Sequence, residues 1–124
     1  SGFFRFMHIP MRSGHTPRES SDLVIDEALS HRLGTDIMGK PLYNFDGDAY
    51  TVKGVCQTFV SSVYYDSEGF IFLLSGFDDY CGHCYVKCKE GQAETVSQEV
   101  RKILKKTLPE SVEVKVSTSH GRHP

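Results

Sequence analysis

Four cysteines are the side chains in this sequence best suited to covalent or metal chemistry. Two of them frame the stretch Cys81-Gly-His-Cys84, and the others are Cys56 and Cys88. Two cysteines separated by two residues form the active site of thiol-disulfide oxidoreductases, where a helix N-terminus lowers the pKa of the first thiol. The stretch 85–91 is predicted to be a strand that ends in a turn, so that helix is missing. An oxidoreductase that uses Cys81 and Cys84 is therefore the alternative function.

The same cysteines allow a zinc site or structural roles. Cys81, Cys84 and Cys88 supply three thiolates, and Cys56 or His83 would be the fourth ligand of a tetrahedral site. In an extended strand Cys84 and Cys88 would lie about 13 Å apart, which opposes both a compact zinc site and a direct disulfide between them. As core thiols, Cys84 and Cys88 would face inward with Cys56 opposite. As bridges, Cys81 would pair with Cys84, or a cross-strand bridge would involve Cys56. We predict no metal, and we name Cys81 and Cys84 as candidate disulfide or reactive thiols.

Other residues that commonly carry chemistry are scattered along the chain. The six histidines show no metal-binding spacing, and the acidic groups at 46–48 and 78–79 are typical of solvated turns. No glycine-rich phosphate loop occurs, which argues against nucleotide binding. We therefore predict no catalytic residue, no cofactor and no enzymatic activity.

Two segments are predicted to lie on the surface and to contact partners. Gly and Pro punctuate the polar stretch Ser13 to Ser21, and the stretch Val60 to Gly69 contains neighbouring aromatic residues. Aromatic side chains are enriched at protein interfaces. We name Val63, Tyr64 and Tyr65 as a candidate partner-contact loop, although a flap packed on its own domain explains them equally well.

Strands and two helices must position these residues. Asp26 is a suitable N-cap for a helix that ends at Gly34, and a second helix is predicted from Gln92 to Pro109. The Asp-Gly turn within 44–48 predicts a hairpin. Strands are predicted at 23–25, 42–43, 49–59, 70–74, 85–89 and 112–116. This order predicts an α+β fold, in which a mixed or mostly antiparallel sheet carries both helices on one face.

Length and composition are those of one ordinary globular domain. The 124 residues are 39% hydrophobic and 24% charged, and the formal net charge is -2. A domain of this size buries roughly two-thirds of its unfolded surface. No basic stripe indicates nucleic acid, and the longest apolar run, Phe70 to Leu74, is far shorter than the ~20 residues that span a bilayer. We predict a single domain over 1–124 that does not bind nucleic acid.

The stretch from Val24 to Phe59 resembles a known family. Its marks are the helix start Asp26-Glu-Ala28, the stop Leu33-Gly34, the pair Gly39-Lys40 and the strand Val52-Lys-Gly-Val55. This order is similar to that of the MacB-like periplasmic core domain in ABC-transporter permeases of the macrolide-exporter, lipoprotein-release and FtsX-like type. The likeness continues through the helix from Gln92. Three positions depart from the family pattern, namely His15, Ile37 and Thr58.

The resemblance implies a non-catalytic extracytoplasmic domain, excised from a larger permease of the inner membrane and facing the periplasm. It also implies several partners: the transmembrane helices of the same polypeptide, a cognate ABC ATPase, and a periplasmic adaptor or a second permease subunit in a dimer. The domain would couple ATP-driven movement of those helices to export or to partner docking. The quoted residues are glycines, caps and core positions, so they identify a scaffold better than an activity.

Overall fold

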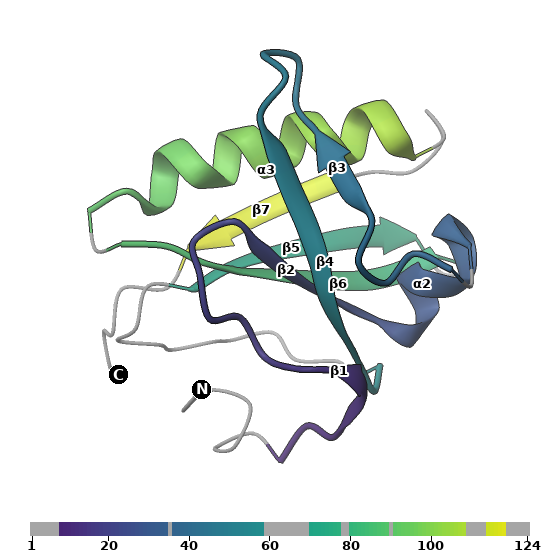
Figure 1. The fold of residues 1–124 in the computed structure, drawn as a ribbon. Helices are drawn as coiled ribbons and strands as arrows, with labels where there is room; N and C mark the ends of the chain where they lie inside the picture. Colours follow the sequence, from purple (N-terminus) through teal and green to yellow (C-terminus); the bar gives the residue numbers. More distant parts are fainter. Residues whose placement is uncertain are drawn as a thin grey trace.

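The chain forms an α+β fold in which one mixed sheet carries two helices (Figure 1). The computed structural model describes residues 8–34, 36–58, 70–77, 80–89, 91–108 and 114–118, and of these it describes the backbone alone at 70–77, 80–82 and 114–118. The helices are α2 (Glu27–Leu33) and α3 (Ala93–Thr107). The strands are β1 (Met11–Gly14), β2 (Asp22–Asp26), β3 (Pro41–Tyr43), β4 (Ala49–Cys56), β5 (Phe70–Phe77), β6 (Tyr80–Lys87) and β7 (Val114–Thr118). The predicted fold class is confirmed.

Seven strands make up the sheet, in the order β1-β4-β2-β6-β5-β7, and β3 pairs with β4 beside this path. The β2–β4 pair is parallel, and every other pairing is antiparallel. Helix α2 and strand β3 connect the parallel pair, since strands that run in the same direction need a crossover between them. Strand β2 is buried along its whole length, as expected for a strand with neighbours on both sides and cover on both faces.

Both helices pack on one face of the sheet. Alternate residues of β2 and β6 face them, and the buried cluster combines Leu23, Ile25, Cys84 and Val86 from these strands with Leu29, Val100 and Leu104 from the helices. The intervening partners Val24 and Tyr85 lie opposite each other in the register and are also fully buried, so the other face of the sheet is covered as well. A strand alternates its side chains between two faces, and here both faces are interior.

Local chemistry sets the ends of α2. The Asp26 side chain accepts a hydrogen bond from the backbone N–H of Leu29 at 2.9 Å, which satisfies one of the free donors in the first turn. Leu29 is the buried residue of this short helix. At the other end, Gly34 has a φ of 116°, and its N–H bonds to the carbonyl of Ser30. The predicted cap and stop are both confirmed.

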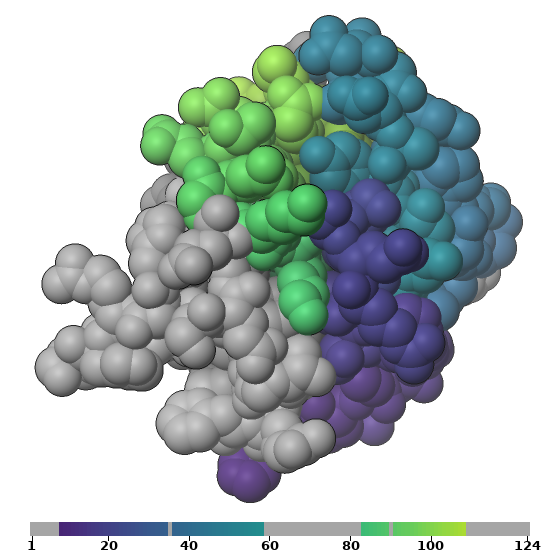
Figure 2. All heavy atoms as spheres, turned by 60° about the vertical axis from the view of Figure 1, so that its left-hand side comes forward, coloured from purple at the N-terminus to yellow at the C-terminus, as the bar shows by residue number. Residues whose placement is uncertain are grey.

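The hairpin and α3 also form as predicted. Strands β3 and β4 pair across the turn 44–48, where Gly47 has a φ of 86° that favours glycine. Helix α3 buries a regular stripe of residues, namely Ala93, Ser97, Val100, Ile103 and Leu104. Most of the residues between them are exposed, while Val96 is half-buried against the same cluster, which is the pattern of an amphipathic helix on a sheet. In Figures 1 and 2 the tip of this hairpin lies beside α3.

Some strand boundaries differ from the prediction. Strand β1 was not expected; it takes Ser13 and Gly14 out of the predicted exposed loop, in which Pro17 is also buried. Strand β6 begins at Tyr80, five residues before the predicted start, because it pairs with β5 from Phe77 opposite Tyr80 onward. Pairing with β5 along this stretch, and with β2 from Cys84 onward, outweighs the weak strand propensity of Gly82. Strand β4 ends at Cys56.

Candidate functional site

The Cys81-Gly-His-Cys84 stretch lies inside β6 and not at the start of a helix. Cys81 pairs with Gly76 and Cys84 pairs with Leu73, in an unbroken antiparallel register. Residues three apart in a strand are about 10 Å apart and point to opposite faces of the sheet, which exceeds the Cα–Cα reach of a disulfide. The helix N-terminus that activates the first thiol in oxidoreductases is therefore not formed at this stretch. The side chain of Cys81 lies outside the described residues.

Cys56, Cys84 and Cys88 are all buried, and Cys56 and Cys84 are free thiols. Burial raises the pKa of the Cys56 thiol to about 12, and the neighbouring charge of Asp26 adds to that effect. Burial also raises the pKa of Cys84 above the ordinary range, again with a contribution from Asp26, and it raises the pKa of Cys88. A thiol in this state is a poor nucleophile and a poor metal ligand, since both roles require the thiolate. The burial of Cys84 and Cys88 agrees with the core-thiol alternative, which the sequence had left open beside structural bridges.

A buried acid and histidine pair lies next to these thiols. Oδ2 of Asp26 is 3.3 Å from Nδ1 of His83, and the two side chains are 0% and 3% exposed. The other carboxylate oxygen of Asp26 caps α2, so a single residue joins the β2–α2 turn to the middle of β6. From the sequence, His83 was considered only within the thiol motif and as a fourth zinc ligand. The pairing could not be read from the sequence because it spans 57 residues and depends on the β2–β6 register.

Three carboxylates gather where the hairpin tip meets α3. Asp46, Asp48 and Glu99 hold oxygen atoms within 4.8 Å of one another. Asn44, which is 2% exposed, organises them: its Oδ1 accepts from the N–H groups of Asp46 and Asp48, and its Nδ2 donates to carboxylates of Asp48 and Glu99. The sequence analysis treated the two aspartates as a solvated turn. Among the described side chains this is the sole group with the composition of a cation site, and hydrogen bonds within it account for its geometry.

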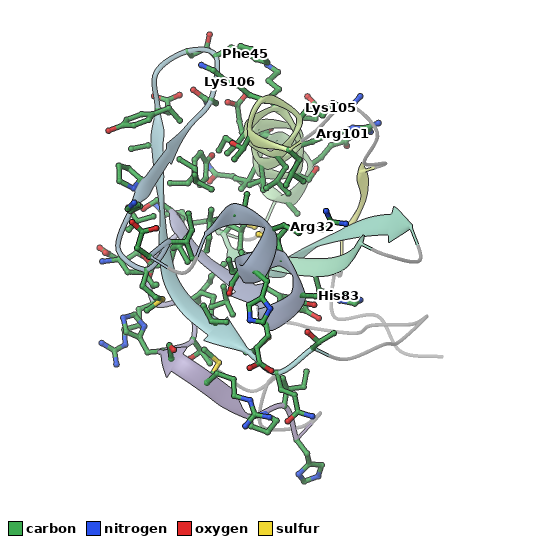
Figure 3. All side chains as sticks on the ribbon, turned by 90° about the vertical axis from the view of Figure 1, so that its right-hand side faces the viewer. Arg32, Phe45, His83, Arg101, Lys105 and Lys106 are labelled. Carbon is green, nitrogen blue, oxygen red and sulfur yellow. The ribbon has the colours of Figure 1, made fainter. Side chains whose placement is uncertain are left out.

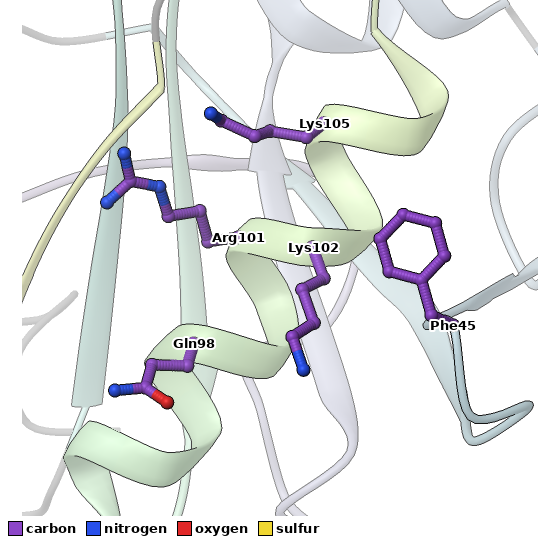
Figure 4. Close-up of a pocket in the computed structure, with 5 residues that line it drawn as sticks. All are labelled: Phe45, Gln98, Arg101, Lys102 and Lys105. Carbon is purple, nitrogen blue, oxygen red and sulfur yellow. The ribbon is translucent and has the colours of Figure 1, made fainter.

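A surface hollow of about 420 Å³ lies on the outer side of α3 (Figure 4). Its walls are mostly apolar and are lined by Phe45, Gln98, Arg101, Lys102 and Lys105. The four helix residues are spaced i, i+3, i+4 and i+7, so they form one stripe along the helix. Phe45 reaches the helix from the hairpin tip and is 66% exposed. The sequence signal for this hollow was present in the basic stretch Arg-Lys-Ile-Leu-Lys-Lys of 101–106, but only the fold brings Phe45 to it.

The candidate contact loop Val63, Tyr64 and Tyr65 lies outside the described residues, as does the whole stretch Val60 to Gly69. The stretch Ser13 to Ser21 is largely exposed apart from its buried Pro17. The structure therefore offers a different exposed aromatic residue, Phe45, which the sequence analysis had placed only in a turn. Neither helix of the described residues is long and apolar enough to cross a bilayer.

Comparison with known proteins finds likeness at the level of structure. No protein-family model matches this chain. No curated protein matches it either. A crystal structure of a domain from Porphyromonas gingivalis, whose parent is described provisionally as a permease, aligns with a TM-score of 0.46 and 18% sequence identity. The alignment covers 95% of this chain and 59% of that one, so the chain spans about three-fifths of the length of that structure.

Proposed function

We propose that this chain is a non-catalytic extracytoplasmic domain of an ABC-transporter permease subunit. The observation that carries the proposal is that the four sequence marks of the MacB-like resemblance form one connected framework. Asp26 caps α2, Gly34 ends it, and Gly39-Lys40 lies against the strand that contains Val52. Resemblance at framework positions supports a shared scaffold, because those residues set the course of the backbone.

Backbone hydrogen bonds join the separate marks. The N–H of Gly39 donates to the carbonyl of Val52 at 2.8 Å, and the N–H of Val52 donates to the carbonyl of Lys40 at 3.2 Å. Strand β2, which ends at Asp26, lies parallel to the same strand β4, with Asp26 opposite Cys56. Chance similarity in four short motifs would not require the motifs to contact each other, so this connectivity favours the permease scaffold.

The glycine of the Val52-Lys-Gly-Val55 mark has its own structural role. Strand β1 pairs antiparallel with β4 at this glycine, and the N–H of His15 donates to the carbonyl of Lys53 at 3.0 Å. A Cβ at Gly54 would meet the backbone carbonyl of His15 and the side chain of Met11. This position therefore needs glycine for the close approach of two strands. A mark that serves the fold in this way says nothing about catalysis, in keeping with a scaffold domain.

The buried thiols support the non-catalytic part of the proposal. Cys84 is fully buried in a strand, and its pKa is raised, so the conditions that activate a redox cysteine do not hold there. In the native protein we expect no catalysed reduction of insulin by dithiothreitol above the uncatalysed rate. Turnover that a Cys84→Ser variant abolishes would instead favour the thiol-disulfide oxidoreductase.

In this proposal the parent subunit supplies what the chain lacks. Transmembrane helices of the same polypeptide would anchor the domain, and a cognate ABC ATPase would drive them. The domain would move with those helices on the periplasmic side and would dock an adaptor or a second permease subunit in a dimer. Its own contribution is a rigid body with exposed docking surfaces, since a single sheet ties its described elements together.

The full parent polypeptide tests the proposal. We expect apolar spans of ~20 residues on both sides of this segment. We also expect that alkaline phosphatase is active when it is fused to the parent directly after residue 124 of this chain, because that enzyme works only outside the cytoplasm. A fluorescent protein fused at the same place serves as the matched reporter for the cytoplasmic side. A parent without apolar spans, or an inactive phosphatase with a fluorescent counterpart, would overturn the assignment.

A further inference from the structure

We propose that the hollow between Phe45 and the outer stripe of α3 binds an acidic peptide segment of a partner protein through one apolar side chain flanked by carboxylates. The proposal concerns the surface of this chain alone and stands whether or not its parent is a permease. It rests on the composition of the hollow, on the arrangement of charges around it and on the acidic turn beside it.

The floor of the hollow suits an apolar side chain. Its wall is mostly apolar, although three of the five residues that line it are cationic. The stems of lysine and arginine provide this apolar surface while their charged ends reach into water. Phe45 adds an aromatic ring at the edge, and about 420 Å³ is enough space for one large side chain. An exposed aromatic residue beside an open hollow is the kind of anchor point found at protein interfaces.

The rim of the hollow is positive. Arg101, Lys102 and Lys105 surround it, and the Nζ of Lys106 lies 5.5 Å from the centroid of the Phe45 ring, in the range of a cation–π contact. Figure 3 shows Lys106 beside Phe45 and the side chains of Arg101 and Lys105 extending from the helix. Lys102 pairs with Glu99 at 3.6 Å, whereas within the described part of the chain Arg101 and Lys105 form no ion pair.

The dipole at the C-terminal end of α3 explains only some of the cations around the hollow. Lys105 and Lys106 lie in the last turn of α3, where cations interact favourably with the helix dipole. Arg101 lies a full turn earlier, and the dipole does not explain the exposed phenyl ring beside the stripe. Arg101 and Lys105, which form no ion pair with the described residues, lie at an apolar hollow and match a ligand that offers carboxylates on either side of an apolar group.

The acidic hairpin turn at 44–48 limits which kind of anionic ligand can bind at the hollow. Asp46 and Asp48 follow Phe45 at the hairpin tip, and both are exposed. A continuous anionic surface, such as a lipid bilayer or a nucleic-acid duplex, would meet these carboxylates together with the cations and would be repelled by them. A short peptide can place its carboxylates on the helix side alone. The charge arrangement therefore favours a peptide over an extended polyanion.

A tryptophan peptide provides a direct probe, because this chain contains no tryptophan. The probe has a central tryptophan between two pairs of glutamates, and its emission shifts to the blue when the indole enters an apolar site. We expect a saturable shift that weakens with added salt. A matched peptide with lysines in place of the glutamates should show no shift, and one with serine in place of tryptophan should compete only weakly.

Variants locate the binding site on the surface. We expect the double variant Arg101→Glu and Lys105→Glu to weaken binding of the tryptophan peptide by about tenfold or more, and Phe45→Ser to weaken it to a similar degree. The control is Lys89→Glu, which makes the same charge change at an exposed position before α3 and should leave binding unchanged. All these positions are exposed, and unfolding midpoints in urea check that each variant remains folded.

Three results would overturn the proposal. The first is absence of a saturable shift with the tryptophan peptide. The second is a shift that neither the Arg101→Glu and Lys105→Glu double variant nor Phe45→Ser weakens. The third is binding of phosphatidylglycerol vesicles, or self-association of the chain, that depends on Arg101 and Lys105 while the peptide fails to bind. In that last case the same cations would serve a membrane surface or a second copy of the chain.

Discussion

At the scale of single residues, Asp26 has three roles that no other described residue combines. It ends the central strand β2, caps α2 through the N–H of Leu29, and lies 3.3 Å from the ring nitrogen of His83. With its hydrogen on Nδ1, the imidazole donates to the carboxylate and the buried acid is satisfied on both oxygens. Buried polar groups that are fully paired specify one arrangement of the core, whereas loss of one partner leaves the other exposed to a large desolvation cost.

Removal of this carboxylate should destabilise the protein strongly. We expect Asp26→Ala to lower the free energy of unfolding by about 3 kcal/mol, because it removes a helix cap and leaves His83 buried without its acidic partner. Asp26→Asn retains a capping oxygen and should lose less than half as much. Urea unfolding measures both, with Asp36→Ala as the exposed control, which should leave the midpoint unchanged. A midpoint for Asp26→Ala equal to that of the wild type would contradict this account of the pair.

The raised pKa of Cys56 makes stability depend on pH. Burial, aided by the charge of Asp26, raises that pKa from 9.0 in the ordinary range to about 12 in the folded protein. The folded state therefore holds the proton more tightly than the unfolded chain does. The stabilisation from this group is complete below about pH 9 and is lost as the pH rises toward 12, at a rate of up to about 1.4 kcal/mol per pH unit.

A variant that lacks only the Cys56 thiol isolates this effect from other groups that titrate at high pH. We expect Cys56→Ala to be less stable than the wild type at about pH 8, where the wild-type thiol is protonated in both states. The difference between the two proteins should shrink by roughly 1 kcal/mol at about pH 10, because only the wild type loses stability through this thiol. Unfolding midpoints in urea at the two pH values provide the measurement. A constant difference would show that Cys56 is not buried as described.

At the scale of elements, the close pairing of β1 with β4 depends on small residues. Gly14 and Gly54 are opposite each other in the register, and Gly14 has a φ of 68°. The backbone carbonyl of Lys53, next to Gly54 in β4, accepts the hydrogen bond from the N–H of His15. The Val-x-Gly-Val pattern that marked the strand in the sequence therefore also fixes where β1 lies.

We expect Gly54→Ala to destabilise the protein by about 2 kcal/mol, the usual cost of overpacking, because the new methyl group meets the His15 carbonyl and Met11. Hydrogen exchange at the His15 N–H should speed up in the same variant, since β1 must move away. Gly47→Asn is the control: nothing lies near its Cβ, and asparagine tolerates positive φ. Equal stability of the Gly54→Ala variant and the wild type would show that β1 does not pack on β4 in solution.

At the scale of the whole molecule, one sheet and one buried cluster hold the described elements together. The hairpin tip is tied back to α3 by Asn44, whose side chain is buried and donates to Glu99. The hollow that we propose as the peptide site lies on the outer side of the same helix. Packed contacts therefore connect the hollow to the central strands. This connection suits a domain that is proposed to move as a rigid body with membrane helices.

The sequence by itself determined most of the elements and the fold class. Asp26 and Gly34 bound a helix because capping is local chemistry, the Asp-Gly turn made a hairpin, and the apolar spacing from Ala93 to Leu104 made an amphipathic helix. Alternation along a strand allowed Cys84 and Cys88 to face the core, but the sequence left structural bridges equally open, and the burial of both thiols came from the fold.

Only the tertiary structure decided the long-range features. The start of β6 at Tyr80, the Asp26–His83 pair and the meeting of Phe45 with α3 each join residues that are far apart in the sequence or depend on a partner strand. Strand propensity is weak and yields to pairing, so a Cys-Gly-His-Cys stretch that looks like a redox turn becomes a central strand once β2 and β5 flank it. Local chemistry is written in the sequence, whereas contacts across the sheet exist only after the strands have assembled.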